Sequence, residues 1–139
     1  MEAASRYKNF PLCYGCGQEN PIGFKLKVTQ EDGETRARFV PGPHHAGFTD
    51  KVHGGVLCVL LDEVLSYLPY LQGLRAVTGK MEVRFKQPAR PGEPLDIRAR
   101  VLKQRSQAMV TESTITNGAG ELVAQAQALV FILGKYEEE

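Results

Sequence analysis

The sequence predicts an α+β fold, in which an antiparallel sheet of about six strands curves around one long central helix. Two observations support this prediction. The first is an apolar stretch of about 15 residues after Gly54, which has no polar side that could face water. The second is a set of segments, before and after that stretch, with the alternation or the bounding turns of strands. A helix that is apolar all round must be covered, so we expect the sheet to wrap it.

Length and composition fit one globular domain and exclude several classes of function. The chain has 139 residues, 42% of them hydrophobic, and its 17 Lys+Arg against 16 Asp+Glu leave a net charge of +1. A surface this close to neutral does not attract nucleic acid or anionic membranes, so we expect neither as a partner. We expect an irregular arm over residues 1–23, a single domain over 24–134 and an acidic tail over 135–139.

A cytoplasmic location is expected for two reasons. No apolar stretch follows the first charged residues, and no window approaches the roughly 18 apolar residues of a membrane span. The three cysteines, Cys13, Cys16 and Cys58, are too few for a disulfide framework, and we expect reduced thiols.

Two strands are expected between the arm and the helix. Apolar and polar residues alternate over 24–29, which is the period of a half-buried strand. Residues 31–34 have the composition of a turn into a second strand near 35–40, so the two form a hairpin. Pro41 ends the second strand because proline lacks the ladder donor.

Four segments with strand character follow the helix, which is expected to end near Pro69. Turn residues separate them, so we expect an antiparallel meander. The alanine- and glutamine-rich run 124–128 is compatible with a helix as well, but the apolar residues after it favour a strand. The predicted strands cover residues 75–87, 94–105, 108–117 and 121–132.

The motif His53-Gly54-Gly55 opens the apolar helix. The first N–H groups of a helix have no acceptor within it, and two glycines leave them uncovered. Together with the helix dipole, such a start can hold an oxyanion or polarise a carbonyl group. The alternative is that the glycines only let another part of the backbone pass close by.

Two adjacent carboxylates, Asp62 and Glu63, lie in the middle of this helix. A buried carboxylate is costly unless it is paired, hydrogen-bonded or facing a cavity. The two side chains are about 100° apart around the helix, so one can line a pocket while the other makes a structural pair. Ser66 follows Asp62 by one turn on the same face, where its hydroxyl can hold the carboxylate or a water molecule.

Helix geometry also predicts a dimer. His53 and Asp62 are nine residues apart, which separates them by about 13 Å along the axis and about half a turn around it. They cannot act on one carbon atom within one chain. If both are catalytic, the helix start of one subunit meets the middle of the other subunit's helix, and a twofold dimer contains two such sites.

Basic residues are concentrated in one segment. Residues 84–105 hold seven Lys or Arg and two acidic residues, a local balance of +5. This segment is either a solvated strand face or a binding surface for phosphate groups.

Together, these motifs resemble those of hotdog-fold acyl-CoA thioesterases of the PaaI-like group. The resemblance implies a sheet around a central helix, homodimers that often pair into tetramers, and hydrolysis of an acyl-CoA to an acid and CoA. It implies no cofactor besides the CoA of the substrate. The motifs that carry it run from Cys13-Tyr14-Gly15-Cys16-Gly17 and Asn20-Pro21 through His53-Gly54-Gly55 and Leu61-Asp62-Glu63 to Val83-Arg84-Phe85-Lys86-Gln87-Pro88, Gly92 and Val101-Leu102-Lys103-Gln104.

The resemblance also implies catalytic roles. In such enzymes the acid nine positions after the motif histidine attacks the thioester or activates water, and the partner subunit's helix start polarises the carbonyl. A hydroxyl group assists the acid. In one branch of the family it lies four residues after the acid, and in another branch it lies on the strand that follows the helix. The corresponding set here is Asp62, the helix start His53, Gly54 and Gly55, and the hydroxyl of Ser66 or Thr78.

The resemblance implies substrate contacts on two segments, 85–90 and 103–106, and we expect Glu63 and His45 to contact the substrate as well. Many relatives carry Asn or Gln at the position of Gly47, and either His45 or His44 can replace that side chain, unless both are simply exposed loop residues. The CoA contacts fall on Phe85, Lys86, Gln87, Pro88, Ala89, Arg90, Lys103, Gln104, Arg105 and Ser106.

The cysteine pair of the arm has the spacing that begins many zinc sites. Four ligands are wanted and no second pair exists, so we expect no metal; a site completed by His44 or His45 is the alternative. Cys58, in the apolar helix, is expected to be a small apolar filler.

The predicted function is hydrolysis of an aryl- or medium-chain acyl-CoA. Two alternatives stay open. One is an enoyl-CoA or acyl-carrier dehydratase of the same fold, and the other is a non-catalytic acyl-CoA-binding module, which Gly47 favours.

Overall fold

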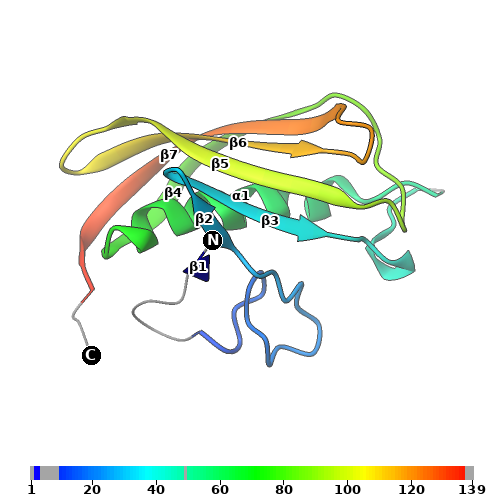
Figure 1. The fold of residues 1–139 in the computed structure, drawn as a ribbon, viewed down its shortest axis with the longest axis horizontal. Coiled ribbons are helices and arrows are strands. Elements are labelled where there is room, and N and C mark those ends of the chain that lie inside the picture. Colours follow the sequence, from blue (N-terminus) through cyan, green and yellow to red (C-terminus); the bar gives the residue numbers. More distant parts are fainter. Residues whose placement is uncertain (1, 4–9, 49, 137–139) are drawn as a thin grey trace.

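A computed structural model describes residues 2–3, 10–48 and 50–136. It contains one antiparallel sheet, one long helix and one 3₁₀ turn (Figure 1). The strands lie side by side in the order β1-β2-β3-β5-β6-β7-β4. The elements are β1 (Glu2–Ala3), β2 (Thr29–Glu31), β3 (Glu34–Phe39), η1 (Pro43–His45), α1 (Gly54–Leu71), β4 (Leu74–Phe85), β5 (Leu95–Gln104), β6 (Ala108–Thr116) and β7 (Leu122–Lys135).

The sheet arches over α1, and the described part of the N-terminal arm lies on the opposite side of the helix (Figure 1). Helix α1 packs against β3, β4, β5, β6 and β7. Both layers bury their apolar faces in one core, which confirms the expected α+β fold of a sheet around a central helix. The largest fully buried apolar side chains are Leu60, Leu61, Val64, Leu65, Leu95, Ile97, Met109, Ile115, Val123 and Val130.

Helix α1 is longer than predicted and continues through Pro69 to Leu71. Its 18 residues have a mean hydropathy of 1.4, so by length and composition alone this helix could cross a membrane. The expectation that no window approaches this limit was therefore wrong. In the described chain 44% of the helix is buried by the rest of the molecule.

The strand predicted over 24–29 is wrong in position, because β2 begins only at Thr29. Phe24, Leu26 and Val28 are buried as the alternation requires, but residues 24–28 lie outside the sheet. The N–H groups of Phe24 and Leu26 donate instead to carbonyl oxygens of the arm, at 2.9 Å each. The alternating burial of residues 24–28 thus comes from the packing of this segment between the arm and the core. The hairpin turn itself is as predicted, and Asp32 and Gly33 both have the positive φ of a type I′ turn.

The four later strands form within one or two residues of their predicted starts, including β7 over the ambiguous run 124–128. The predicted simple meander is wrong for β4, which pairs with β7 and not with β5. The connection over residues 86–94 passes across the end of the sheet from β4 to β5, so the turn residues at 91–94 belong to a longer loop. Strand β4 therefore forms one edge of the sheet, opposite β1. Residues 137–139 of the predicted acidic tail lie outside the described residues.

Candidate active site

The helix start is capped by its own histidine. His53 has an extended backbone with ψ of 136°, and its Nδ1 accepts a hydrogen bond from the Gly55 N–H at 2.8 Å. A Cβ at Gly55 would lie 3.0 Å from that nitrogen, so glycine makes room for the imidazole. The prediction of two uncovered N–H groups is therefore wrong for Gly55. The Gly54 N–H has no acceptor in the described part of the chain, and it remains the donor available to a ligand.

Asp62 is half-buried and its carboxylate is held from β4. The Thr78 hydroxyl donates to Asp62 Oδ1 at 2.9 Å. A register shift in the β4–β7 pairing between Thr78 and Lys80 marks a bulge beside this contact, and such bulges redirect the side chains next to them. Of the two hydroxyl residues that the resemblance implies, Ser66 and Thr78, it is Thr78 that contacts the Asp62 carboxylate.

Ser66 is exposed and bonds elsewhere. Its hydroxyl donates to the backbone carbonyl of Asp62 at 2.7 Å, a bond that serine often makes to the preceding helical turn. The prediction that Ser66 can hold the Asp62 carboxylate is not met in this arrangement.

Glu63 points away from Asp62 and toward the arm. Cys13 Sγ lies 3.7 Å from Glu63 Oε1, and burial raises the pKa of the Glu63 carboxyl, with the nearby Asp62 charge adding to the rise. The adjacent carboxylates of Asp62 and Glu63 thus lie in different surroundings, as their separation of about 100° around the helix predicts. The arm, and not the Asp62 side of the helix, is where Glu63 makes its contacts.

The loop before the helix uses its histidine structurally. His45 Nδ1 accepts from the Gly42 N–H at 2.9 Å, and its ring packs against Phe24 and Phe39 with centroids 5.3 and 5.1 Å away. A Cβ at Gly47 would lie 3.2 Å from the Cα of His53, so an Asn or Gln there would crowd the helix start. His45 Nδ1 is thus engaged within the loop, and the replacement of an Asn or Gln side chain by His45 or His44 stays a prediction. His44 is exposed.

The two segments implied in CoA binding lie at opposite ends of the sheet. The Lys86 N–H donates to the Val123 carbonyl at the start of β7, whereas the Ile132 N–H near the end of β7 donates to Gln107. Nine residues of strand separate those points, which is about 30 Å. One chain therefore does not bring 86–90 and 103–106 together.

Several residues of these segments are already engaged. Ala89 is fully buried in the described chain, so its side chain is not presented to a ligand there. Gln87 donates to the Leu122 carbonyl at 3.1 Å, and Gln104 exchanges hydrogen bonds with Gln72. Pro88 and Phe85 are exposed.

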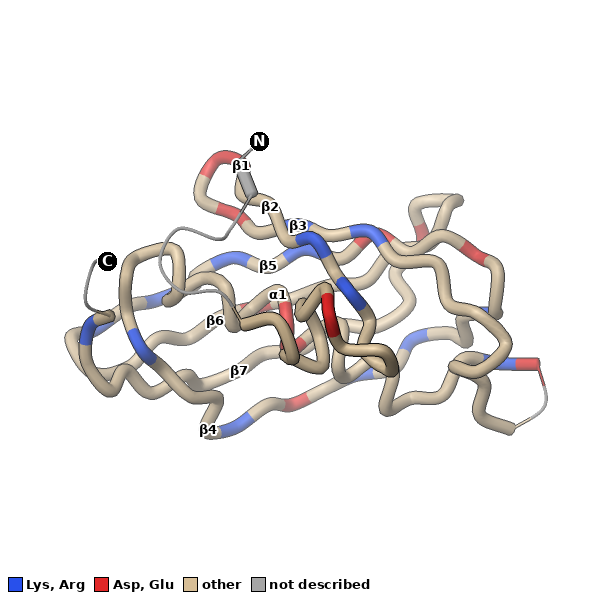
Figure 2. The backbone as a smooth tube through the Cα atoms, turned by 90° about the horizontal axis from the view of Figure 1, so that it is seen from below, with Lys and Arg blue, Asp and Glu red and all other residues tan. Residues whose placement is uncertain are grey.

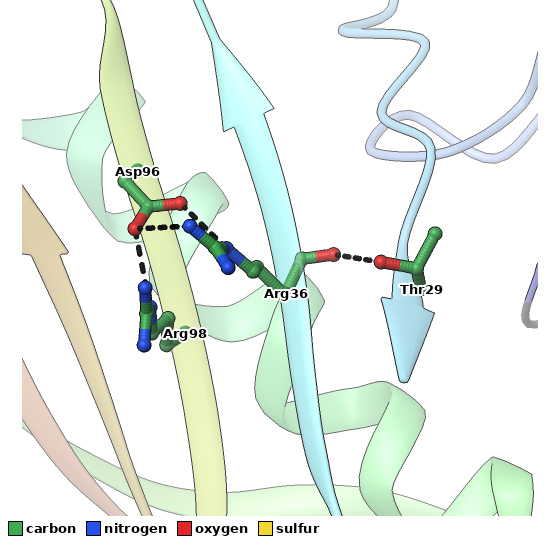
Figure 3. Close-up of polar contacts among 4 residues, drawn as sticks. All are labelled: Thr29, Arg36, Asp96 and Arg98. Carbon is green, nitrogen blue, oxygen red and sulfur yellow. Dashed lines mark hydrogen bonds and ion pairs between the residues drawn. The ribbon is translucent and has the colours of Figure 1, made fainter. Parts of the chain in front are cut away.

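The predicted basic segment is partly neutralised. Figure 3 shows Asp96 of β5 between two guanidinium groups, with Arg36 Nε and Arg98 Nε each 3.1 Å from its carboxylate. Arg100 pairs with Glu112, and Arg90 with Asp50. Lys and Arg positions are spread along the backbone of β3, β4 and β5 (Figure 2). Within the described chain, Arg84, Lys86, Lys103 and Arg105 have no acidic partner.

Lys103 and Arg105 border an open groove of about 410 Å³ together with Ser106. Its apolar floor and basic rim suit a ligand that carries both an apolar part and phosphate groups.

The family profile described as the thioesterase superfamily matches residues 50–124, which include the helix start, Asp62 and Thr78. The chain belongs to the thioesterase superfamily. This thioesterase is 27% identical to human acyl-coenzyme A thioesterase 13 over 130 residues, covering 91% of this chain and 87% of the relative.

Solved structures give the same fold. The thioesterase matches the Escherichia coli PaaI protein from the phenylacetic acid degradation operon with a TM-score of 0.77 and 24% identity, over 81% of this chain and 83% of that one. It matches a Streptococcus pneumoniae thioesterase protein solved with coenzyme A with a TM-score of 0.76 and 21% identity, over 81% and 88%. Variants of that protein with one aspartate or one threonine replaced by alanine are also solved. The expected hotdog fold, PaaI-like resemblance and thioester-hydrolase class are confirmed.

Sequence reasoning missed one grouping near the site. It treated the cysteine pair of the arm as an incomplete motif, whereas Cys13, Cys16 and Glu63 lie together beside α1. In the sequence, the only hint of this grouping is Gly15 between the two cysteines. The structure shows its role, because a Cβ at Gly15 would overlap the Glu63 carboxylate.

Proposed function

We propose that this chain is an acyl-CoA thioesterase in which Asp62 is the nucleophile or the general base. The observation that carries the proposal is the Asp62 carboxylate, placed in an apolar helix and oriented by the Thr78 hydroxyl at 2.9 Å. Human acyl-coenzyme A thioesterase 13 supports an acyl-CoA as substrate. The aspartate and threonine replaced in the Streptococcus pneumoniae variants are sixteen positions apart, the same spacing as Asp62 and Thr78.

The proposed reaction needs one proton acceptor and one carbonyl activator. As general base, Asp62 takes a proton from water, the hydroxide attacks the thioester carbon, the C–S bond breaks, and the CoA thiolate takes up the proton. As nucleophile, the carboxylate displaces the thiolate to form a mixed anhydride, which water then hydrolyses. In both routes Thr78 occupies Oδ1 and leaves Oδ2 for the chemistry. The Gly54 N–H stabilises the developing oxyanion.

Two neighbouring contacts on β4 support an active site shared between subunits. Asp62 lies beside Thr78, and Gly54 lies beside Phe85, whose ring would be 3.6 Å from a Cβ at that glycine. The outer edge of β4 is free for pairing in the described chain. An antiparallel pairing of two β4 strands about a twofold axis near residues 81–82 would place Phe85 of one chain opposite the partner subunit's Thr78. Gly54 would then approach the partner subunit's Asp62.

The same pairing explains why the CoA segments lie apart in one chain. Residues 86–90 follow the end of β4 that would meet the beginning of the partner's β4. The partner's residues 103–106 lie near the beginning of its β4, because both are next to the end of β7. We therefore propose a homodimer whose CoA sites are built from both chains, with pairing into a tetramer as a further step.

A thiol-release assay with a panel of acyl-CoA substrates tests this function. We expect turnover of aryl- or medium-chain acyl-CoA, and we expect Asp62→Asn to lose most of it while it still binds CoA in calorimetry. CoA binding without thiol release by the wild-type protein would instead identify a binding module. Hydration of an enoyl-CoA, detected by loss of its ultraviolet absorbance, would identify a dehydratase. An Asp62→Asn variant with full activity would refute the assignment of the carboxylate.

A further inference from the structure

The arm carries a tight turn that is fixed in place beside α1. The Gly17 N–H donates to the Cys13 carbonyl at 2.8 Å, which closes the turn around the two cysteines. The Tyr14 and Gly15 carbonyls accept from the N–H groups of Phe24 and Leu26, whose side chains are buried in the core. The turn between the cysteines is therefore held by backbone bonds to a buried segment, and its side chains have a defined position.

Three ligand-type side chains meet at this turn. Cys13, Cys16 and Glu63 each offer one ligand atom, and these atoms lie within 4.8 Å of one another; all three residues are half-buried. A tetrahedral zinc ion with Zn–S bonds of about 2.3 Å and Zn–O bonds of about 2.1 Å separates its ligand atoms by roughly 3.5–3.8 Å. The Cys13 Sγ to Glu63 Oε1 distance is already 3.7 Å. Shifts of about 1 Å or less would complete the geometry.

Gly15 and Gly17 allow the two cysteines and Glu63 to come together. A Cβ at Gly15 would overlap the Glu63 carboxylate, so glycine lets the acid approach the turn between the cysteines. A Cβ at Gly17 would overlap backbone atoms of Pro11 and Cys13, so the turn itself requires glycine. The Cys16 N–H lies 3.5 Å from Cys13 Sγ, where it supports negative charge on that sulfur.

Within residues 2–3, 10–48 and 50–136, no Lys or Arg side chain forms an ion pair with Glu63. Cys13, Cys16, Glu63 and the neighbouring Tyr67 thus share one half-buried place, and the described part of the chain provides no cation beside it. A divalent ion would supply the missing charge and hold the two sulfurs as thiolates.

We propose that Cys13, Cys16 and Glu63 form a binding site for a divalent metal ion of the zinc type, which fastens the arm to α1. Two thiolates and one carboxylate favour zinc over magnesium or calcium, which prefer oxygen ligands alone. The fourth position is open to water or to the Tyr67 hydroxyl, which interacts with the Cys16 thiol. The absence of a second cysteine pair does not exclude a metal, because the third ligand comes from the helix. The metal-free arm expected from the sequence is the alternative that the following experiment tests.

Cobalt substitution tests the site without any measurement of activity. Reduced, metal-stripped full-length protein is titrated with Co²⁺, and the metal content of protein purified without chelator is measured by mass spectrometry. We expect thiolate-to-cobalt charge transfer in the near ultraviolet, the strong visible bands of tetrahedral cobalt, and binding of about one ion per chain. A wild-type protein that develops no such bands would overturn the proposal.

Variants assign the ligands. Cys13→Ser and Cys16→Ser should each abolish or shift the charge-transfer band, and Glu63→Gln should weaken Co²⁺ binding by about tenfold or more. Gly15→Ala should weaken it as well, with Gly118→Ala as the matched control because nothing lies within 4 Å of a Cβ there. Cys58→Ser is the control for loss of a thiol outside the cluster. Unchanged cobalt spectra in Cys13→Ser and Cys16→Ser would also overturn the proposal, and the wild-type titration decides even if a variant fails to fold.

Discussion

Thr78 Oγ1 donates a hydrogen bond to Asp62 Oδ1 at 2.9 Å, and this bond joins the middle of α1 to the edge strand β4. A carboxylate in the middle of an apolar helix needs polar partners in place of lost water. Among the described residues Thr78 is the side chain that does so, and Asp62 Oδ2 has no hydrogen-bond partner there. The contact orients one oxygen and leaves the other accessible.

Replacing Thr78 should therefore lower turnover through the orientation of Asp62. We expect Thr78→Val, which keeps the shape and removes the hydroxyl, to reduce kcat by about 10- to 100-fold, because a hydrogen bond to a charged group contributes about 1.5–3 kcal/mol. Thr78→Ser should retain most activity. Steady-state thiol release measures both.

The matched control for this variant is Ser66→Ala. Ser66 donates to the backbone carbonyl of Asp62, so its loss should change kcat by less than about threefold and stability by about 0.5 kcal/mol or less. Strong inactivation by Ser66→Ala together with an active Thr78→Val enzyme would show that the hydroxyl roles are reversed.

The Gly54 N–H can be removed without breaking the helix. Gly54 is the first helical residue, where proline is well tolerated, and His53 before it already has the extended backbone that a following proline requires, with φ of −61° and ψ of 136°. We expect Gly54→Pro to stay folded and to lose about 10²- to 10³-fold in kcat, the usual effect of deleting one oxyanion donor.

Gly54→Ala separates this effect from crowding. It keeps the N–H, and its Cβ would have ordinary contact with Phe85 at 3.6 Å. We expect the alanine variant to be at least as stable as wild type in thermal melts and far more active than the proline variant. Equal activity of the two variants would exclude Gly54 N–H as an oxyanion donor.

Lys103 and Arg105 should act on the phosphates of the substrate and not on its thioester. Both border the open groove at the end of β5 and lack an acidic partner among the described residues. Replacing both by alanine should raise KM for acyl-CoA by about tenfold and leave KM for the corresponding acyl-pantetheine, which has no phosphates, unchanged.

Arg98→Ala is the control for general loss of positive charge. Arg98 pairs with Asp96 at 3.1 Å, so its removal should leave both KM values near wild type. A similar rise in KM for both substrates in the Lys103 and Arg105 variant would point to a structural effect and contradict a phosphate contact.

Local signals in the sequence were sufficient for the central helix and the later strands. The apolar run after Gly54 predicts the start of α1, and the turn residues between 85 and 122 predict where the later strands begin, but neither predicts the end of α1 or the pairing of β4 with β7. The region 24–28 was misassigned because burial alternates there without a strand partner. The backbone hydrogen bonds from Phe24 and Leu26 to the arm explain this burial, and no local sequence pattern predicts them.

The site divides in the same way. Asp62 stands out in the sequence because a carboxylate in an apolar helix needs an explanation. The preference of Ser66 for a backbone carbonyl, the capping of Gly55 by His53, and the grouping of Glu63 with the arm cysteines depend on side-chain orientation and on contacts between distant segments. Periodicity carries no information about either.

Mixing two inactive variants would test the shared active site. In a twofold dimer built as proposed, each site takes Gly54 from one chain and Asp62 from the other. A mixed dimer of Asp62→Asn with Gly54→Pro then contains one site with both defects and one with neither. Random reassembly makes half of the dimers mixed, so activity should recover to roughly a quarter of wild type after the two variants are unfolded and refolded together. Each variant refolded alone is the control. If both groups acted within one chain, every site in the mixture would keep one defect, and no recovery would follow.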